Sequence, residues 1–303
     1  MKKILLATTL LAATTGFAAA EVTLSGDARM GVISDFGSDE VAFTSRARVK
    51  FTLSGETDGG LTFGGSFRAH DAVGAKNGDA GSVFISGAFG KLSMGDVDGA
   101  ANAAVGHVSG VGLTGLSDLN ESTFIAKGVG PATTNNRSVA LYEYSTGDLT
   151  IYASVTNPGT AAGSNSDAYS VAAKYALGDY TVALGYEAVE ARAGGDSLSH
   201  IILGGSATFG AVTVKANYGV ADLTDLSPAF GSDETQYAIS VDYKADALTV
   251  TAFYNNKEDL GAQEAYGLGA SYDLGGGASV VGGYVKNETT DEDAYDLGVS
   301  MSF

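Results

Sequence analysis

Alternation of apolar and polar residues with a period of two runs through most of this chain and limits the folds that it can adopt. Between residues 22 and 33, apolar and small residues occupy the even positions, and most odd positions are polar. The segments 179–190 and 263–274 largely repeat this pattern. Because neighbouring side chains of a strand point to opposite faces, this period indicates strands with one apolar face. Helical spacing is hard to find after residue 20.

We predict sixteen strands, joined alternately by short turns and by longer polar loops. The strands are expected near residues 22–33, 41–55, 60–71, 80–89, 90–97, 137–145, 148–157, 167–177, 179–190, 198–209, 211–221, 234–245, 247–256, 263–274, 277–287 and 292–303. About ten residues per strand suffice to cross a bilayer at a tilt. Short turns on one side and long loops on the other are typical of bacterial outer-membrane barrels. For the strand 137–145 both faces carry large apolar residues, and the outward face stays open.

In lipid, only helices and closed sheets satisfy every backbone hydrogen-bonding group. The sequence therefore predicts an all-β fold, a 16-stranded antiparallel transmembrane β-barrel, with 15 Tyr and 13 Phe to supply interfacial aromatic girdles. A soluble β-sandwich or β-propeller would also alternate. A propeller should repeat about every 40 residues, and no such repeat is found. A sandwich rarely needs so many strands of this length.

The first twenty residues have the features of a secretory signal peptide. Lys2 and Lys3 precede an apolar stretch, and the run Ala18–Ala20 offers a small-residue cleavage site before Glu21. We therefore expect cleavage after Ala20 and a single barrel domain over 21–303. Removal of two Lys and no acid leaves 15 basic and 35 acidic residues, a formal charge of −20. This acidic excess argues against nucleic-acid binding, which needs a basic surface. The exported chain has no Cys, so no disulfide stabilises it.

Basic residues gather on the inward face of the first three predicted strands, although acids outnumber bases in the chain. They are Arg29, Arg46, Arg48, Lys50 and Arg68, with His70 at the upper end of the same face. A turn centred near residues 57–58 would bring Arg48 level with Arg68. Sixteen strands leave room for an aqueous channel, so we interpret these side chains as one wall of a pore. The alternative is that each is simply a solvated inward residue.

The connection from Val97 to Asn136 is too long for an ordinary loop. Structureless loops beyond about 15 residues are usually functional or disordered. This one is rich in Gly, Ala and Val, and its acids are Asp96, Asp98, Asp118 and Glu121. We expect it to fold inside the barrel and narrow it, with its acids facing the basic wall; such opposed charges tune ion selectivity. The alternative is a long external loop that only covers the surface.

Four segments and the C-terminal residue are shared with a known family. The segments are 24–31 (LSGDARMG), 62–70 (TFGGSFRAH), 86–96 (SGAFGKLSMGD) and 267–283 (GLGASYDLGGGASVVGG), and the chain ends in Phe303. In these the chain resembles the general porins of Gram-negative outer membranes, above all those of the alphaproteobacterial branch. The resemblance covers essentially the whole chain after residue 20.

The resemblance implies a homotrimer in contact with outer-membrane lipid and lipopolysaccharide, and a third loop folded into each pore. It also implies that Arg29, Arg46, Arg48, Lys50 and Arg68 form the wall of an eyelet, and that Asp96, Asp98, Asp118 and Glu121 are the loop acids opposite. Some relatives bind calcium among loop carboxylates. Asp222, Asp225, Asp233 and Glu234 are the candidates here, without EF-hand spacing.

We therefore predict a general diffusion porin, which passes ions and small hydrophilic solutes with a mild cation preference and is not an enzyme. The chain lacks a Cys nucleophile and a G-x-S-x-G elbow, and His70, His107 and His200 lie outside metal motifs. One alternative is a substrate-specific channel, such as one for oligosaccharides, although the inward aromatics Tyr152 and Phe253 form no continuous ladder. Others are an outer-membrane hydrolase that pairs His200 with a Ser, and a purely structural barrel.

Overall fold

A computed structural model describes most of the chain after the first nineteen residues. The described residues are 20–38, 40–72, 81–126, 139–156, 166–191, 198–222, 234–258 and 263–303. The predicted signal peptide lies almost entirely outside them. None of the helices among these residues is long and apolar enough to cross a membrane.

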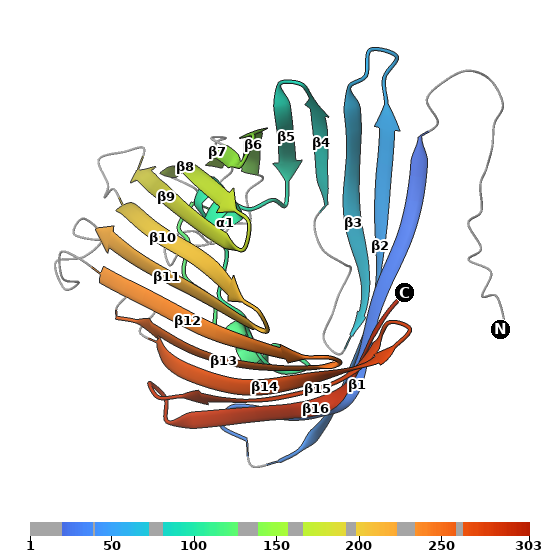
Figure 1. Ribbon diagram of the computed structural model, residues 1–303, viewed down its shortest axis with the longest axis vertical. Coiled ribbons are helices and arrows are strands. Elements are labelled where there is room, and N and C mark those ends of the chain that lie inside the picture. Colours follow the sequence, from blue (N-terminus) through green and yellow to red (C-terminus); the bar gives the residue numbers. More distant parts are fainter. Residues whose placement is uncertain are drawn as a thin grey trace.

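Sixteen strands form one closed antiparallel barrel, in which each strand pairs with its neighbours in sequence and β1 pairs with β16 (Figure 1). The strands are β1 (Glu21–Ser34), β2 (Ala42–Glu56), β3 (Thr62–Ala72), β4 (Ser82–Gly87), β5 (Gly90–Gly95), β6 (Val139–Thr146), β7 (Leu149–Thr156), β8 (Ser166–Leu177), β9 (Tyr180–Ala191), β10 (Leu198–Phe209), β11 (Val212–Asp222), β12 (Glu234–Ala245), β13 (Leu248–Lys257), β14 (Gln263–Gly275), β15 (Ala278–Asn287) and β16 (Glu292–Ser302). The predicted fold class is confirmed.

The two faces of the sheet differ as the alternation predicts. On β9, Val182 and Leu184 are about half exposed on the outside, whereas Glu187 is fully buried on the inside. On β6, Val139 and Leu141 are buried on the inward face, so the tyrosines of this strand point outward. The outer surface is therefore an apolar band, as a lipid-facing barrel requires.

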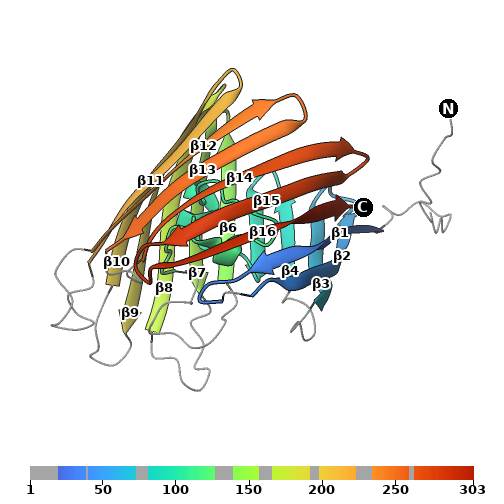
Figure 2. The same cartoon turned by 90° about the horizontal axis from the view of Figure 1, so that it is seen from below.

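The tight turns gather at one end of the barrel, together with the C-terminus (Figure 2). Between β8 and β9 and between β10 and β11 the chain reverses in two residues. Gly178 and Gly210 take the left-handed φ values of +59° and +61° that such turns need.

The turn between β2 and β3 corrects one prediction. Arg48 pairs with His70, and it is Lys50 that pairs with Arg68, so the register is shifted by two residues. The reason is a wider turn. The backbone N–H of Thr57 donates to the Leu61 carbonyl, and the Leu61 N–H returns a hydrogen bond to the Thr57 hydroxyl. This five-residue turn is centred at residue 59, and a shift of two leaves every side chain on its predicted face.

The described part of the connection between β5 and β6 lies against the inner face of the sheet (Figure 1). It contains the helix α1 (Ala100–Val105) and the 3-10 turn η1 (Leu116–Asp118). Serine hydroxyls of β7 and β8, on Ser154 and Ser170, accept the first two backbone N–H groups of α1 at 2.8 Å. Farther along, Val111 and Leu116 pack against inward residues of β12 to β16 in the largest buried apolar cluster. We call residues 96–126 the inner segment.

Candidate pore constriction

The predicted basic wall contains an acid that sequence reasoning missed. The register of β1 and β2 sets Arg29 opposite Arg46 and Asp27 opposite Arg48. The Asp27 carboxylate accepts hydrogen bonds from Arg46 Nη2 at 3.0 Å and from Arg48 Nε at 2.9 Å. One carboxylate shared by two guanidinium groups leaves this trio of side chains with a single net positive charge. The only sequence signal for this role was the inward phase of Asp27.

Arg29 connects the wall to the inner segment. Its Nη1 donates to the Leu113 carbonyl at 3.2 Å. Leu113 rests on Gly31 and Gly298, a glycine pair across β1 and β16; a Cβ at either position would come within 2.7 Å of the leucine Cδ2. The inner segment therefore touches the wall itself at this point.

Lys50 lines a recess of about 410 Å³ on the lumenal side of β2 to β6. Asp98 of the inner segment lines the same recess, as do Lys91 on β5 and Glu143 on β6. The Lys91 Nζ lies 5.1 Å from the centroid of the Phe84 ring. Acids and bases thus face one solvent-filled space. Among the predicted residues, Lys50 and Asp98 are the base and the loop acid that this recess brings together.

The other predicted residues are distributed around the lumen. Arg68 is half-buried on β3, beside Lys50, and the side chain of His70 lies outside the described part of the structure. Asp96 is exposed at the end of β5, and Asp118 is exposed in η1, which packs near β15 and β16. The Glu121 carboxylate lies 3.8 Å from His107 Nε2 within the inner segment. The loop acids therefore do not form one compact group.

His107 is a further titratable group of the inner segment. The backbone N–H of Ser122 donates to its Nδ1 at 3.1 Å, so the ring proton resides on Nε2, toward Glu121. Burial lowers the pKa of His107, while the carboxylates of Glu121 and Asp98 act in the opposite direction. The neutral ring is therefore the form that this fold favours at neutral pH.

Buried polar side chains of the barrel anchor the inner segment, and sequence reasoning missed all of them. Asp296 on β16 accepts the N–H groups of Leu113 and Thr114 and the Thr114 hydroxyl, at 2.9, 2.6 and 2.8 Å. Further anchors are Glu187, Asn217, Gln236, Ser240 and Asn255. Their signal in the sequence is a polar residue at an inward position, which a water-filled lumen also explains.

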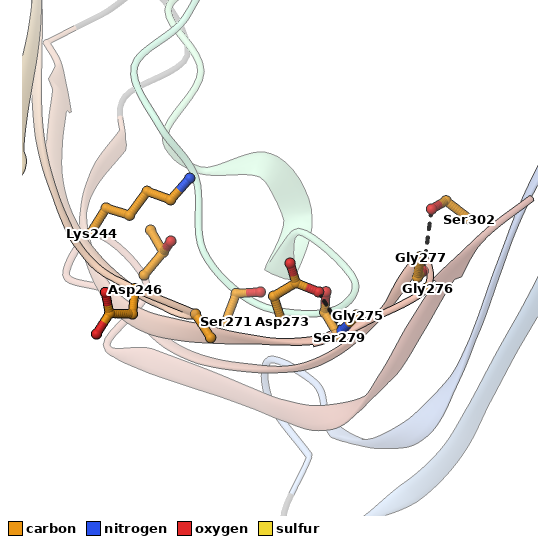
Figure 3. Close-up of a pocket in the computed structure, with 11 residues that line it drawn as sticks. Lys244, Asp246, Ser271, Asp273, Gly275, Gly276, Gly277, Ser279 and Ser302 are labelled. Atoms are coloured by element: carbon orange, nitrogen blue, oxygen red, sulfur yellow. Dashed lines mark hydrogen bonds between the residues drawn. The ribbon is translucent and has the colours of Figure 1, made fainter. Parts of the chain in front are cut away.

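A second recess, of about 420 Å³, opens on the lumenal side near the tight-turn end (Figure 3). Its polar lining includes Lys244, Asp246 and Asp273, and the Asp273 carboxylate accepts the Gly275 N–H at 2.8 Å. Figure 3 shows the Lys244 side chain directed toward the inner segment. The lumen is thus lined by charges of both signs at this end as well.

Of the calcium candidates, Asp222 and Glu234 end and begin strands β11 and β12, and Asp225 and Asp233 fall outside the described residues. Within the described ranges no group of three or more His, Asp or Glu side chains forms a potential metal site.

The residues that suggested a substrate-specific channel or a hydrolase make other contacts within the barrel. Phe253 is buried against the inner segment, which removes one of the two inward aromatics from any solute path. Both ring nitrogens of His200 are engaged, Nδ1 with Glu187 and Nε2 with Gln236, each at 2.9 Å. His200 is therefore not poised as the base for a serine nucleophile.

The chain matches the family model described as "Gram-negative porin" over residues 7–293. It is 42% identical to a porin of Rhodobacter capsulatus and 26% identical to a porin of Fuscovulum blasticum; each match covers 93% of this chain and all of the relative. A porin structure refined at 1.8 Å resolution superposes with a TM-score of 0.79 at 41% identity, and a mutant Rh. blastica porin with 0.71 at 24%. Both cover 93% of this chain and all of the other. The chain therefore belongs to the Gram-negative porin family, and it is a general porin of the outer membrane that passes ions and solutes and is not an enzyme.

Proposed function

We propose that the inner segment narrows the lumen to a mixed-charge opening through which small hydrophilic solutes diffuse. Arg29, Arg46, Arg48, Lys50, Arg68 and His70 are the basic side, and Asp96, Asp98, Asp118 and Glu121 are the acidic side. The observation that carries the proposal is the recess of about 410 Å³ shared by Lys50 and Asp98. Opposed charges across a narrow opening create a transverse field that favours polar solutes.

Ion selectivity in this proposal is weak and slightly cationic. Asp27 offsets part of the charge of Arg46 and Arg48, which lie 3.0 and 2.9 Å from its carboxylate. Glu143 adds an acid beside Lys91 in the shared recess. A passing ion therefore meets nearly balanced fixed charges.

We also propose that the mature protein begins at Glu21 and assembles as a homotrimer through the arc β1 to β5. Strands β4 and β5 have six residues each, and β6 and β7 have eight. A tilted strand needs about 9–11 residues to cross the bilayer. Strands β4 and β5 are therefore too short to span the bilayer alone, and we infer that another protein subunit covers them. The exposed side chains of Val83 and Met94 give that subunit an apolar contact surface.

The tyrosines support the same division of the outer face. All 15 tyrosines lie at residue 142 or beyond, so β1 to β5 have none, and all of them except the inward-facing Tyr152 point out of the barrel. Tyrosine is enriched where a barrel meets the lipid headgroups. We assign the arc β6 to β16 to outer-membrane lipid and, at the end with the long loops, to lipopolysaccharide.

Single-channel recording in a planar bilayer tests the diffusion mechanism. We expect large ohmic steps that arrive in threes, a small reversal potential of cationic sign in a salt gradient, and no block by sugars. Small steps from folded protein, or saturable block by one sugar, would instead identify a specific channel.

A further inference from the structure

Three inward-facing polar side chains from three strands form a buried chain of contacts. Glu187 on β9, His200 on β10 and Gln236 on β12 are each at most 1% exposed. His200 Nδ1 lies 2.9 Å from Glu187 Oε2, and His200 Nε2 lies 2.9 Å from Gln236 Nε2. Burial of this much polarity is costly unless every group has a partner.

The two ends of this chain hold the backbone of the inner segment. Glu187 accepts the N–H groups of Ile125 at 2.9 Å and Ala126 at 3.2 Å. The Gln236 Oε1 accepts the Thr123 N–H at 2.7 Å, and its Nε2 donates to the Thr123 carbonyl at 2.9 Å. Four backbone hydrogen bonds of residues 123–126 therefore depend on these side chains.

A glycine makes the contact between His200 and Gln236 possible. Their strands are separated by β11, and Gly219 of β11 lies below the contact. A Cβ at Gly219 would lie 2.6 Å from His200 Nε2 and 3.0 Å from Gln236 Nε2. Only glycine leaves the space in which these two side chains meet across the intervening strand.

The contacts assign the proton of the His200 ring. Thr123 fixes the orientation of the Gln236 amide, because it offers one donor and one acceptor. The second N–H of Gln236 then points at His200 Nε2, which must accept. The ring proton is on Nδ1 and is donated to Glu187. In this arrangement His200 is neutral and Glu187 is ionised, with three N–H donors.

A second proton on the His200 ring is incompatible with this hydrogen-bond arrangement. It would set an N–H on Nε2 against the N–H of Gln236. Rotation of the Gln236 amide by half a turn restores that contact but reverses both bonds to Thr123. Protonation therefore costs Gln236 either its contact with His200 or both of its hydrogen bonds to Thr123.

Among the residues that the structure describes, few other charged groups lie near the ring. On β12, Glu234 lies level with His200, with Ala221 of β11 between them. From the inner segment, the Phe124 ring contacts the rings of both His200 and His107, with centroids 6.2 and 5.4 Å away. A proton on His200 would thus lie beside the Glu187 carboxylate, and β11 contributes only Gly219 and Ala221 next to the ring.

We propose that Glu187, His200 and Gln236 are positioning residues that form a proton-operated latch for the inner segment. When His200 is neutral, the latch holds Thr123 against the inner face of the barrel. In acid Thr123 is released, while Glu187 still holds Ile125 and Ala126. The effect on conduction rests on the proposed function, because it requires that the inner segment narrows the pore.

Hydrogen exchange of single amides in the folded full barrel tests the latch without reference to conduction. Protection of the Thr123 amide, corrected for the intrinsic rate at each pH, should fall at least about tenfold between about pH 8 and about pH 5, as both hydrogen bonds between Gln236 and Thr123 are lost. The Leu113 amide, held by Asp296, is the internal reference and should not follow. Constant Thr123 protection over this range overturns the latch.

Three variants separate His200 from other causes. His200→Gln cannot take up a proton, so its Thr123 protection should be independent of pH. Gln236→Glu offers an acceptor to a protonated His200 Nε2 and still accepts the Thr123 N–H, so its Thr123 amide should stay protected in acid; this variant has nearly the same shape and serves if His200→Gln does not fold. His107→Gln should keep the wild-type response, and loss of the response in that variant would assign the effect to His107 and refute the proposal.

Single-channel recording of the same proteins then tests the consequence. We expect closures or current noise to increase in acid in the wild type and not in His200→Gln. If Thr123 is released in acid while the current stays unchanged, the latch stands and the proposed narrowing by the inner segment fails.

Discussion

At the scale of single residues, the proposed basic wall contains one carboxylate that two arginines share. Arg46 and Arg48 supply two positive charges, and Asp27 cancels one of them within 3.0 Å. A charge at about 8 Å from a passing ion contributes ~0.5 kcal/mol in a high dielectric, which is a factor of about two in permeability. Substitutions here should therefore change selectivity in small, signed steps.

Neutralisation of both arginines, Arg46→Gln with Arg48→Gln, should raise the cation-to-anion permeability ratio by about two- to fivefold, because it also leaves Asp27 without a counter-charge. Asp27→Asn should lower the ratio by about twofold. Reversal potentials in a salt gradient measure both changes. Equal reversal potentials for wild type and both variants would show that these side chains do not face the ion path.

His107 provides a prediction about proton binding. Burial lowers its pKa in the folded state, so the unfolded chain binds a proton more readily. The neutral ring therefore makes its full contribution to the free energy of unfolding above the ordinary pKa of about 6.5. This contribution is lost as the pH falls below that value. Since Glu121 raises the pKa of His107, Glu121→Gln should lower it further. NMR titration of the ring measures both values, and a midpoint above about 6.5 would contradict the burial argument.

At the scale of elements, the strands were predictable, whereas the contacts that position the inner segment were not. Period-two alternation marks a strand because every second residue meets lipid, and β9 and β12 begin and end within a residue or two of expectation. The inner segment shows no regular alternation of apolar and polar residues. It is positioned by scattered long-range bonds, such as those of Asp296 and Glu187, whose partners a sequence does not reveal. The register of β2 and β3 failed for a similar reason, because the Thr57 side chain widens the turn.

The position of the inner segment also depends on glycines of the barrel, which leave space for it. A Cβ at Gly185 on β9 would lie 2.5 Å from the Ala101 Cβ of α1. Gly185→Leu should push α1 toward the centre of the lumen and lower the single-channel conductance, with overpacking that costs about 1–3 kcal/mol. Leu184→Ala, on the outer face of the same strand, is the matched control and should conduct like the wild type. Unchanged conductance of Gly185→Leu would mean that α1 does not border the path.

At the scale of the whole molecule, the barrel has two kinds of outer wall. The arc β6 to β16 has every tyrosine of the chain and strands of mostly ten or more residues. The arc β1 to β5 has no tyrosine and includes the two six-residue strands. The first arc has the features of a lipid-facing surface. The second arc includes strands too short to cross the bilayer, which favours contact with another protein subunit.

This division can be tested with the same substitution on each arc. Val83 on β4 and Val182 on β9 both point outward and are 62% and 49% exposed in the single barrel. Val83→Arg buries a charge in the proposed subunit interface, where an unpaired charge is strongly unfavourable, and should yield monomers in detergent. Val182→Arg costs up to about 2–4 kcal/mol of insertion energy in lipid but should leave the trimer intact. Sedimentation or light scattering of the refolded proteins distinguishes the two. A trimeric Val83→Arg beside a monomeric Val182→Arg would move the interface to the tyrosine-bearing arc, and monomers for the wild type would remove it.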